Sequence, residues 1–178
     1  QQNLFFNLHG QYTMSTDYRL PDGTYLFNSR FNQRAIKFSI AHRFKKFQNI
    51  LRYQHHFENP GIPGHAHVIN PAEINILDIT SSSIELNNDY KSTIPYQLVN
   101  NNLFTFQSNY LTNDLKLSFH VGYFINNLKE HEKWTRPDFD ISIKHLQLSP
   151  NIRYGVDKFT FNIGSQISTL ENVNNQNN

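Results

Sequence analysis

The stretch from Asp114 to Asn126, DLKLSFHVGYFIN, alternates between apolar and polar side chains. Its odd positions are apolar and its even positions are mostly polar, with Phe124 as the exception. Successive side chains of a strand point to opposite faces, so this alternation predicts a β-strand with one apolar and one polar face. At about 3.4 Å a residue the strand spans roughly 40 Å, whereas an average strand has about five or six residues. Such length is typical of a tilted strand that crosses a membrane.

The same alternation recurs along the chain and predicts further strands. They cover about residues 3–16, 30–44, 47–57, 97–110 and 159–169, and one more runs from Asp138 to a turn at Asp157-Lys158. In that last strand Phe139, Ile141 and Ile143 alternate with Asp140, Ser142 and Lys144, and Pro150 is expected to interrupt the ladder. The Asn-rich residues 171–178 are predicted to be coil.

The predicted connections alternate between long and short. Lys45-Lys46, 112–114 and Asp157-Lys158 are short, whereas residues 17–28, 58–93 and 127–137 are long. Outer-membrane barrels show this asymmetry between their two rims. The sequence therefore predicts an all-β protein, an antiparallel up-and-down meander of about seven long amphipathic strands that forms part of a larger transmembrane β-barrel.

The composition supports this prediction and argues against some classes of function. Only 38% of the residues are hydrophobic while 14% are aromatic, a balance that suits a sheet with one wet face. No apolar run approaches the roughly 18 residues of a membrane helix, so we expect any crossing to be made by strands. Lysine and arginine are scattered, which argues against a nucleic-acid partner. Cysteine is absent, so disulfides and thiolate metal sites are excluded. Gln1-Gln2-Asn3 leads straight into a predicted strand, so we expect a removed leader or a start within a longer protein.

Three groups of residues resemble the barrel portion of TonB-dependent outer-membrane receptors. They are Arg52-Tyr53-Gln54 leading to Pro60-Gly61-Ile62-Pro63-Gly64-His65, Pro95-Tyr96-Gln97 leading to Asn126-Asn127-Leu128-Lys129-Glu130, and the run from Phe159 to Gln166 that ends in Asn172. The family commonly has Arg where Leu128 stands, and often has an acidic and His-rich insertion after Glu130.

The resemblance implies that residues 1–178 are a partial receptor barrel domain, about a third of a barrel of about 22 strands that is filled by a plug domain. It implies location in the outer membrane of a Gram-negative type of cell. The implied partners are outer-membrane lipid, the protein's own plug domain and the energising TonB complex. The implied function is active uptake of a scarce nutrient, such as a ferric siderophore or another metal chelate. No resident cofactor is expected, and a metal or its chelate enters only as cargo.

Four histidines in and after the third predicted strand form a candidate metal site. They are His55, His56, His65 and His67, and Glu58 lies nearby. Imidazole and carboxylate ligands suit Zn²⁺, Cu²⁺ or Ni²⁺, and the prolines of this segment limit the entropy lost on binding. However, His55 and His56 point to opposite faces of one strand, and the spacing matches no closed site, so solvated polar residues are the alternative.

A second set of candidates consists of basic residues on the polar faces of the strands. Lys37, Arg52, Lys116, His120 and Lys144 are expected to contact either a plug or a passing anionic substrate. Tyrosines near strand ends, among them Tyr53, Tyr96 and Tyr110, suit an aromatic girdle at a lipid boundary.

Catalysis finds little support in the sequence, and the one enzymatic alternative is a metal hydrolase built on the histidine-rich segment. Ser82 and its neighbours lack a Gly-x-Ser-x-Gly context, and no glycine-rich phosphate loop follows a strand. We therefore expect no enzyme. The alternative to a transporter is a soluble β-sheet module that binds a ligand or metal through the Pro-Gly segment. A transporter would need detergent for its extraction from cells, whereas the soluble module would not.

Overall fold

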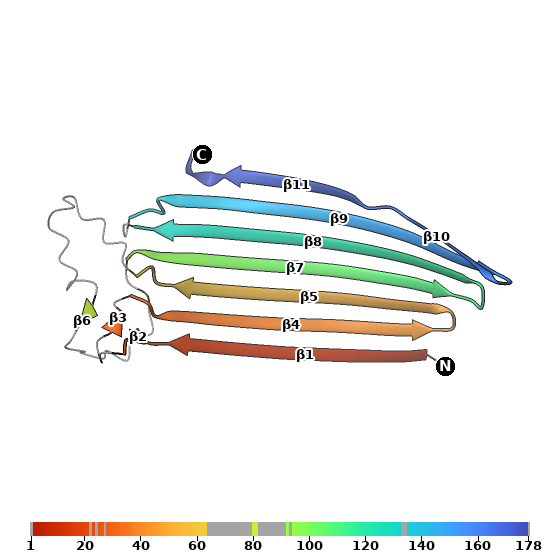
Figure 1. Ribbon diagram of the computed structural model, residues 1–178, viewed down its shortest axis with the longest axis horizontal. Coiled ribbons are helices and arrows are strands. Elements are labelled where there is room, and N and C mark those ends of the chain that lie inside the picture. Colours follow the sequence, from red (N-terminus) through yellow and green to blue (C-terminus); the bar gives the residue numbers. More distant parts are fainter. Residues whose placement is uncertain are drawn as a thin grey trace.

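The computed structural model of this chain is dominated by one β-sheet (Figure 1). It describes residues 2–21, 23, 25–26, 28–63, 80–81, 92, 94–132 and 135–177. The long elements are β1 (Gln2–Ser15), β4 (Phe31–Phe44), β5 (Phe47–Pro60), β7 (Tyr96–Leu111), β8 (Leu115–His131), β9 (Phe139–Val156), β10 (Phe159–Gly164) and β11 (Ile167–Asn174). The short elements are β2 (Tyr18–Arg19), β3 (Tyr25–Leu26), β6 (Thr80–Ser81) and the 3-10 helix η3 (Asn175–Asn177). Within the described part of the chain, no helix has the length and apolar character needed to cross a membrane.

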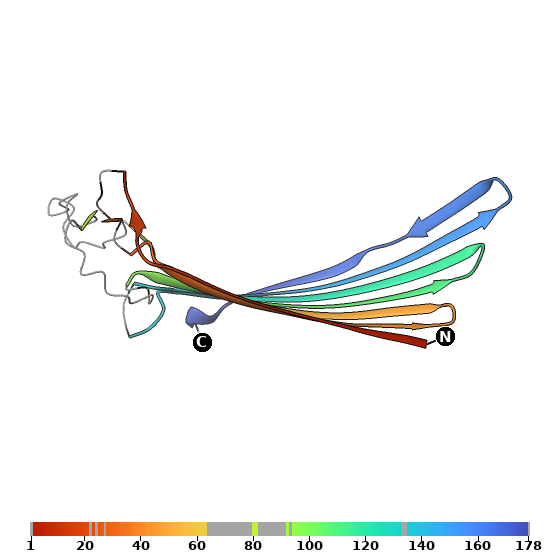
Figure 2. The same ribbon diagram turned by 90° about the horizontal axis from the view of Figure 1, so that it is seen from below.

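The large sheet is an antiparallel meander, as the sequence predicts. Its eight strands follow the order β1-β4-β5-β7-β8-β9-β10, and β11 also pairs with β9. β2, β3 and β6 form a separate small sheet at one end. Among the described strands the large sheet is open, with β1 at one edge and β10 and β11 at the other. In Figure 2 the strands fan out toward one end, because the sheet twists.

All short turns of the large sheet lie at one end, which we call the short-turn end, and the longer links lie at the other, the long-connection end (Figure 1). The short turns are Lys45-Lys46, residues 112–114 and Asp157-Lys158. Lys45 and Asp157 adopt positive φ angles of 49° and 51°, which close these turns tightly. The predicted alternation of long and short connections is confirmed, but two predicted links were too long, because residues 58–60 belong to β5 and residues 127–131 belong to β8.

The seventh long strand is split into β10 and β11 at a proline of its neighbour. Ser165 donates its backbone N–H to the carbonyl of Pro150 at 3.1 Å, but proline has no N–H with which to return the bond. β9 itself continues through Pro150, so the ladder is interrupted toward the next strand only. The predicted coil from residue 171 was wrong at its start, because Glu171 to Asn174 pair with β9.

The two faces of the sheet differ in polarity. We call the side that bears Leu117, Val121 and Tyr123 the apolar face, and the side that bears Lys116 and His120 the polar face. The register places further large apolar residues on the apolar face, among them Leu4, Phe6, Leu8, Phe38, Ile40, Leu51, Tyr53, Phe104, Phe106, Leu146, Leu148, Ile152, Phe161 and Ile163. The polar face carries mainly Asn, Gln, Ser, Thr, Lys, Arg and His, but it also bears some large apolar residues, among them Phe5, Ile50, Leu103 and Phe124.

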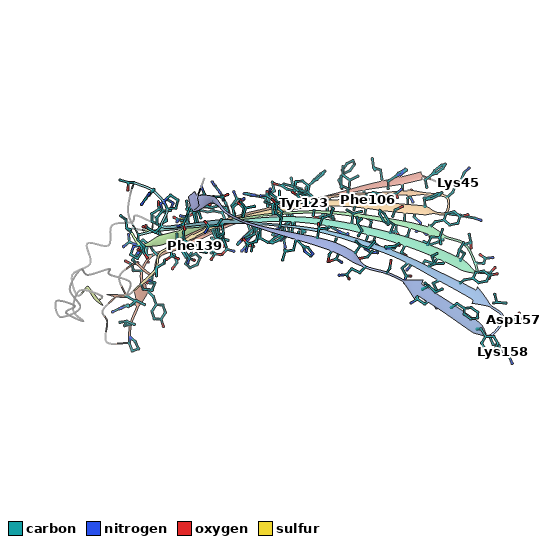
Figure 3. The ribbon with its side chains drawn as sticks, turned by 90° about the horizontal axis from the view of Figure 1, so that it is seen from above. Lys45, Phe106, Tyr123, Phe139, Asp157 and Lys158 are labelled. Atoms are coloured by element: carbon teal, nitrogen blue, oxygen red, sulfur yellow. The ribbon has the colours of Figure 1, made fainter. Side chains whose placement is uncertain are left out.

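No described residue covers the apolar face. Figure 3 shows side chains standing on both sides of a single layer, and no described hydrophobic residue is buried. Phe6, Leu8 and Ile163 are 66%, 72% and 73% exposed. Burying apolar surface is the main favourable term in folding, at about 25 cal/mol for each Å², so this face needs an apolar environment that the described residues do not provide.

The polarity of β9 changes phase along the strand. Phe139, Ile141 and Ile143 lie on the polar face, whereas Leu146, Leu148 and Ile152 lie on the apolar face. Lys144 lies opposite Ile125 and therefore falls on the apolar face, not on the face of Lys116 where it was expected. The change occurs level with Ile125, where the apolar residues of β8 end, so it marks a border of the apolar surface.

A buried polar cluster, the loop latch, joins two of the longer connections. It consists of Asp17, Asn28, Arg30, Gly61, Ser92 and Pro95. Asn28 is 1% exposed, has a φ of 61° and donates its side-chain amide to the Pro95 carbonyl at 2.6 Å. Arg30 pairs with Asp17, and the Ser92 hydroxyl donates to the Asn59 carbonyl at 2.9 Å. A Cβ on Gly61 would lie 2.2 Å from the Asn28 carbonyl oxygen, which explains the glycine of the Pro-Gly segment.

The latch generates the first prediction. Gly61→Ala is expected to lower the free energy of unfolding by about 1–3 kcal/mol, because the new methyl group overlaps backbone and forces Asn28 to move. Gly122→Ala is the matched control: its Cβ meets nothing within 4 Å, so we expect an unchanged or slightly raised stability. Denaturant unfolding of both variants measures the difference. Equal stabilities would show that the close approach at Gly61 does not exist.

Candidate functional site

The basic candidates from the sequence divide between the two faces. Lys37 on β4, Arg52 on β5, and Lys116 and His120 on β8 all lie on the polar face. Lys144 lies on the apolar face, where its Nζ is 3.4 Å from Glu171 Oε2 and both side chains are well exposed. An exposed pair of this kind contributes little to stability. The polar face is therefore the place where most of the predicted residues come together.

Lys37 and Arg52 meet at a shallow hollow of about 250 Å³ near the middle of the polar face. Arg52 lies directly opposite Ser39, and Lys37 lies opposite Gln54, so the two cations are diagonal neighbours across β4 and β5. Diagonal neighbours are within reach of long side chains. The hollow is also lined by Asn7, Phe38, Ser39, Tyr53, Gln54, Leu103 and Thr105. Two positive charges thus share the hollow with neutral hydrogen-bonding groups and with apolar side chains.

Further cations lie nearer the short-turn end of the polar face. Lys116 lies directly opposite Arg153 on β9, and both side chains are exposed. Like charges directly opposite each other on one face are destabilising, so an anion beside them would relieve the repulsion. The sequence reasoning missed Arg43, Arg153 and His9, which lies opposite Lys37. Their alternation with apolar neighbours was the signal that could have found them.

Carboxylates are nearly absent from this face in the described strands. Glu58 and Glu130 point to it, but both lie toward the long-connection end, beyond the level of the Asn101–Asn126 pair. Glu130 accepts a hydrogen bond from the Gln97 side chain at 2.8 Å. From Asn126 to the short-turn end, the described residues of the polar face offer positive charge without a carboxylate partner.

The predicted histidine site is not assembled by the described residues. Nδ1 of His55 lies on the apolar face, 3.1 Å from the Asn102 Oδ1, which also accepts a hydrogen bond from the Tyr53 hydroxyl at 2.9 Å. His56 lies on the polar face, in a hollow of about 340 Å³ with Gln54 and Asn101. His65 and His67 fall outside the described residues. Within the part of the chain that the structure describes, no group of three or more His, Cys, Asp or Glu residues can hold a metal ion.

A second polar cluster, the rim cluster, lies on the apolar face beyond Ile125, near the long-connection end. It consists of Lys129, Asp140, Ser142 and Asn175. Asp140 is 9% exposed, its Oδ2 lies 3.1 Å from Lys129 Nζ, and its Oδ1 accepts a hydrogen bond from the Asn175 side chain at 2.9 Å. Burial by itself raises the pKa of Asp140, but these hydrogen bonds and the charges of Lys129 and His131 outweigh it, so the pKa is lowered. A hollow of about 580 Å³ adjoins the cluster and is also lined by Arg136.

Comparisons of the chain with protein-family models, curated proteins and solved structures find no significant match. The resemblance to TonB-dependent receptors therefore rests on the sequence motifs alone. The function is argued below from the two faces of this sheet.

The rim cluster generates the second prediction. A carboxyl group whose pKa is lowered in the folded state contributes stability above its unfolded pKa of about 3.9, and this contribution is lost as the pH falls through the folded value. Asp140→Asn is therefore expected to destabilise the protein at pH 7, and the difference from wild type should shrink as the pH falls below about 4. Unfolding at several pH values measures it. Asp114→Asn, in a short turn, is the control, and a pH-independent difference for Asp140→Asn would contradict the assignment.

Proposed function

We propose that this chain is part of the transmembrane barrel of a TonB-dependent outer-membrane receptor that imports a scarce nutrient, such as a ferric siderophore or another metal chelate. The observation that carries the proposal is the uncovered apolar face of a sheet whose opposite face is polar. A soluble sheet packs its apolar face against a second layer. A membrane barrel instead turns that face to lipid and its polar face to the lumen.

The height of the apolar surface supports lipid contact. On β8 it runs from Leu115 to Ile125, which is roughly 33 Å along the strand at about 3.3 Å a residue. A strand tilted by about 40° reduces this to a vertical height of about 25 Å, the usual height of the apolar band of an outer-membrane barrel. The strands continue past this band toward the long-connection end, where Asn127, Lys129 and Asp140 occupy the same face.

Aromatic pairs lie at two levels of the apolar face. Phe47 and Tyr110 lie near the short-turn end, with their ring centroids 4.9 Å apart. Tyr53 and Phe104 lie near the other border, with their centroids 4.7 Å apart. The Tyr53 hydroxyl donates to Asn102, one level further from the centre of the band. A ring in the apolar band with its hydroxyl at a polar border is the arrangement of an aromatic girdle.

One polar pair within the band is mutually hydrogen-bonded. Asn49 and Ser108 lie opposite each other on the apolar face, and the Ser108 hydroxyl donates to Asn49 Oδ1 at 2.7 Å. Burying a polar group costs about 1–3 kcal/mol when it has no hydrogen bond, so a mutual bond makes the pair compatible with lipid.

The proposal also assigns the partners. Unpaired strand edges are not tolerated in lipid, so further strands of the same protein would pair with β1 and with β10 and β11. A plug domain would then occupy the lumen beside the polar face, and the TonB complex would energise transport from the periplasmic side. The short-turn end would face the periplasm, because outer-membrane barrels have their short turns there.

Neighbouring positions on β7 test the proposal. Phe106 lies on the apolar face and Gln107 on the polar face. We expect the fluorescence of a Phe106→Trp variant to be quenched strongly in vesicles whose lipid chains carry bromine, and that of a Gln107→Trp variant to be quenched weakly. In both variants Trp134 and any other tryptophan of the natural protein are replaced by Phe, so that the introduced tryptophan is the sole emitter.

The same preparation separates the proposal from its alternative. The natural protein should remain in the membrane fraction until detergent is added. Recovery without detergent, together with equal quenching at both positions, would exclude the barrel and favour a soluble β-sheet binding module.

A further inference from the structure

We propose that the hollow between Lys37 and Arg52, the anion subsite, binds a carboxylate or phosphate group of a small-molecule cargo. The inference rests on the proposed function, because it needs the polar face to line a lumen in which cargo passes between the barrel wall and the plug. It goes further than the proposed function because it states that the cargo is anionic and names the residues that bind it. The histidines of the predicted metal site take no part in it.

The charge distribution supports an anionic ligand. Lys37 and Arg52 are exposed, and the three ion pairs found among the described side chains involve other residues. The described carboxylates of the polar face, Glu58 and Glu130, lie further toward the long-connection end. A positive site without a protein counter-charge attracts anions, and low-dielectric walls strengthen this attraction.

The chemistry of the hollow suits an oxyanion. The guanidinium of Arg52 presents a planar fork that matches a carboxylate or phosphate, and the Lys37 ammonium adds a point charge. Asn7, Ser39 and Thr105 line the same hollow and provide neutral donors. A volume of about 250 Å³ is below the usual range for a complete ligand pocket, which begins at about 300 Å³. The hollow therefore suits one charged group of a larger molecule.

Further cations extend from the subsite toward the short-turn end. Arg43 lies on β4 with Lys37, and the opposed Lys116 and Arg153 lie on β8 and β9. By register, Lys116 is eight residue steps from the level of Lys37, or roughly 26 Å along the strand direction at about 3.3 Å a step. This distance exceeds the reach of one small anion. The series thus provides successive weak sites along the strands, and exposure to solvent and salt keeps each one weak enough for release.

Binding of a small polyanion by the natural, full-length protein in detergent tests the subsite. Isothermal titration at low salt would use citrate and inorganic phosphate as probes. We expect citrate to bind the wild-type protein, and Lys37→Gln/Arg52→Gln to weaken its affinity about tenfold or more. The control is Lys46→Gln/Lys158→Gln, which removes the same charge from two short turns and should leave the affinity unchanged. Raising the salt concentration should weaken binding to the wild-type protein.

Each other outcome overturns the inference. Absence of citrate and phosphate binding to the wild-type protein refutes the subsite, and equal losses in both double variants show a general charge effect. If poly-glutamate binds through Lys37 and Arg52 while citrate and phosphate do not, the occupant is an acidic polypeptide instead. A protein that shows the expected quenching at residues 106 and 107 yet fails here keeps its proposed function and loses only the subsite.

Discussion

The register of the long ladders is the constraint on which the rest of the structure depends. Side chains alternate with a period of two, so a slip of one residue would move every apolar residue of a strand to the other face. Across β4, β5, β7 and β8 the pairing keeps Phe38, Tyr53, Phe104 and Tyr123 at one level and on one side. One continuous apolar surface results, although no described hydrophobic residue is buried. The backbone bonds are made within the sheet, but the apolar face gains its favourable free energy only from an apolar neighbour.

The two ends of the sheet are stabilised by different interactions. Near the short-turn end, links of two or three residues hold adjacent strands in register. Near the other end, the strands extend beyond the apolar surface, and polar networks replace apolar contacts. The loop latch there depends on Asn28 at positive φ and on a glycine at residue 61, because any side chain would overlap the Asn28 backbone. The rim cluster around Asp140 marks the same change of environment on β9.

The polar face combines a structural and an electrostatic role. Its many amide and hydroxyl groups suit water, and over the stretch that includes Lys37, Arg52 and Lys116 its cations have no carboxylate partner among the described residues. Placing like charges opposite each other, as at Lys116 and Arg153, costs free energy that an anion can offset. The polar residues that keep this face hydrated therefore also favour the binding of anions to it.

The sequence by itself determined the strands, their antiparallel order and the alternation of short and long links, because side-chain periodicity and turn residues are local signals. It also placed Lys37, Arg52, Lys116 and His120 on polar faces. Only the tertiary structure decided which residues share a level across strands, since register depends on pairing between distant segments. That pairing placed Lys144 on the apolar face and brought Asn28 against Gly61. Each of these placements depends on residues that are distant in the sequence, so the periodicity of a single strand cannot predict it.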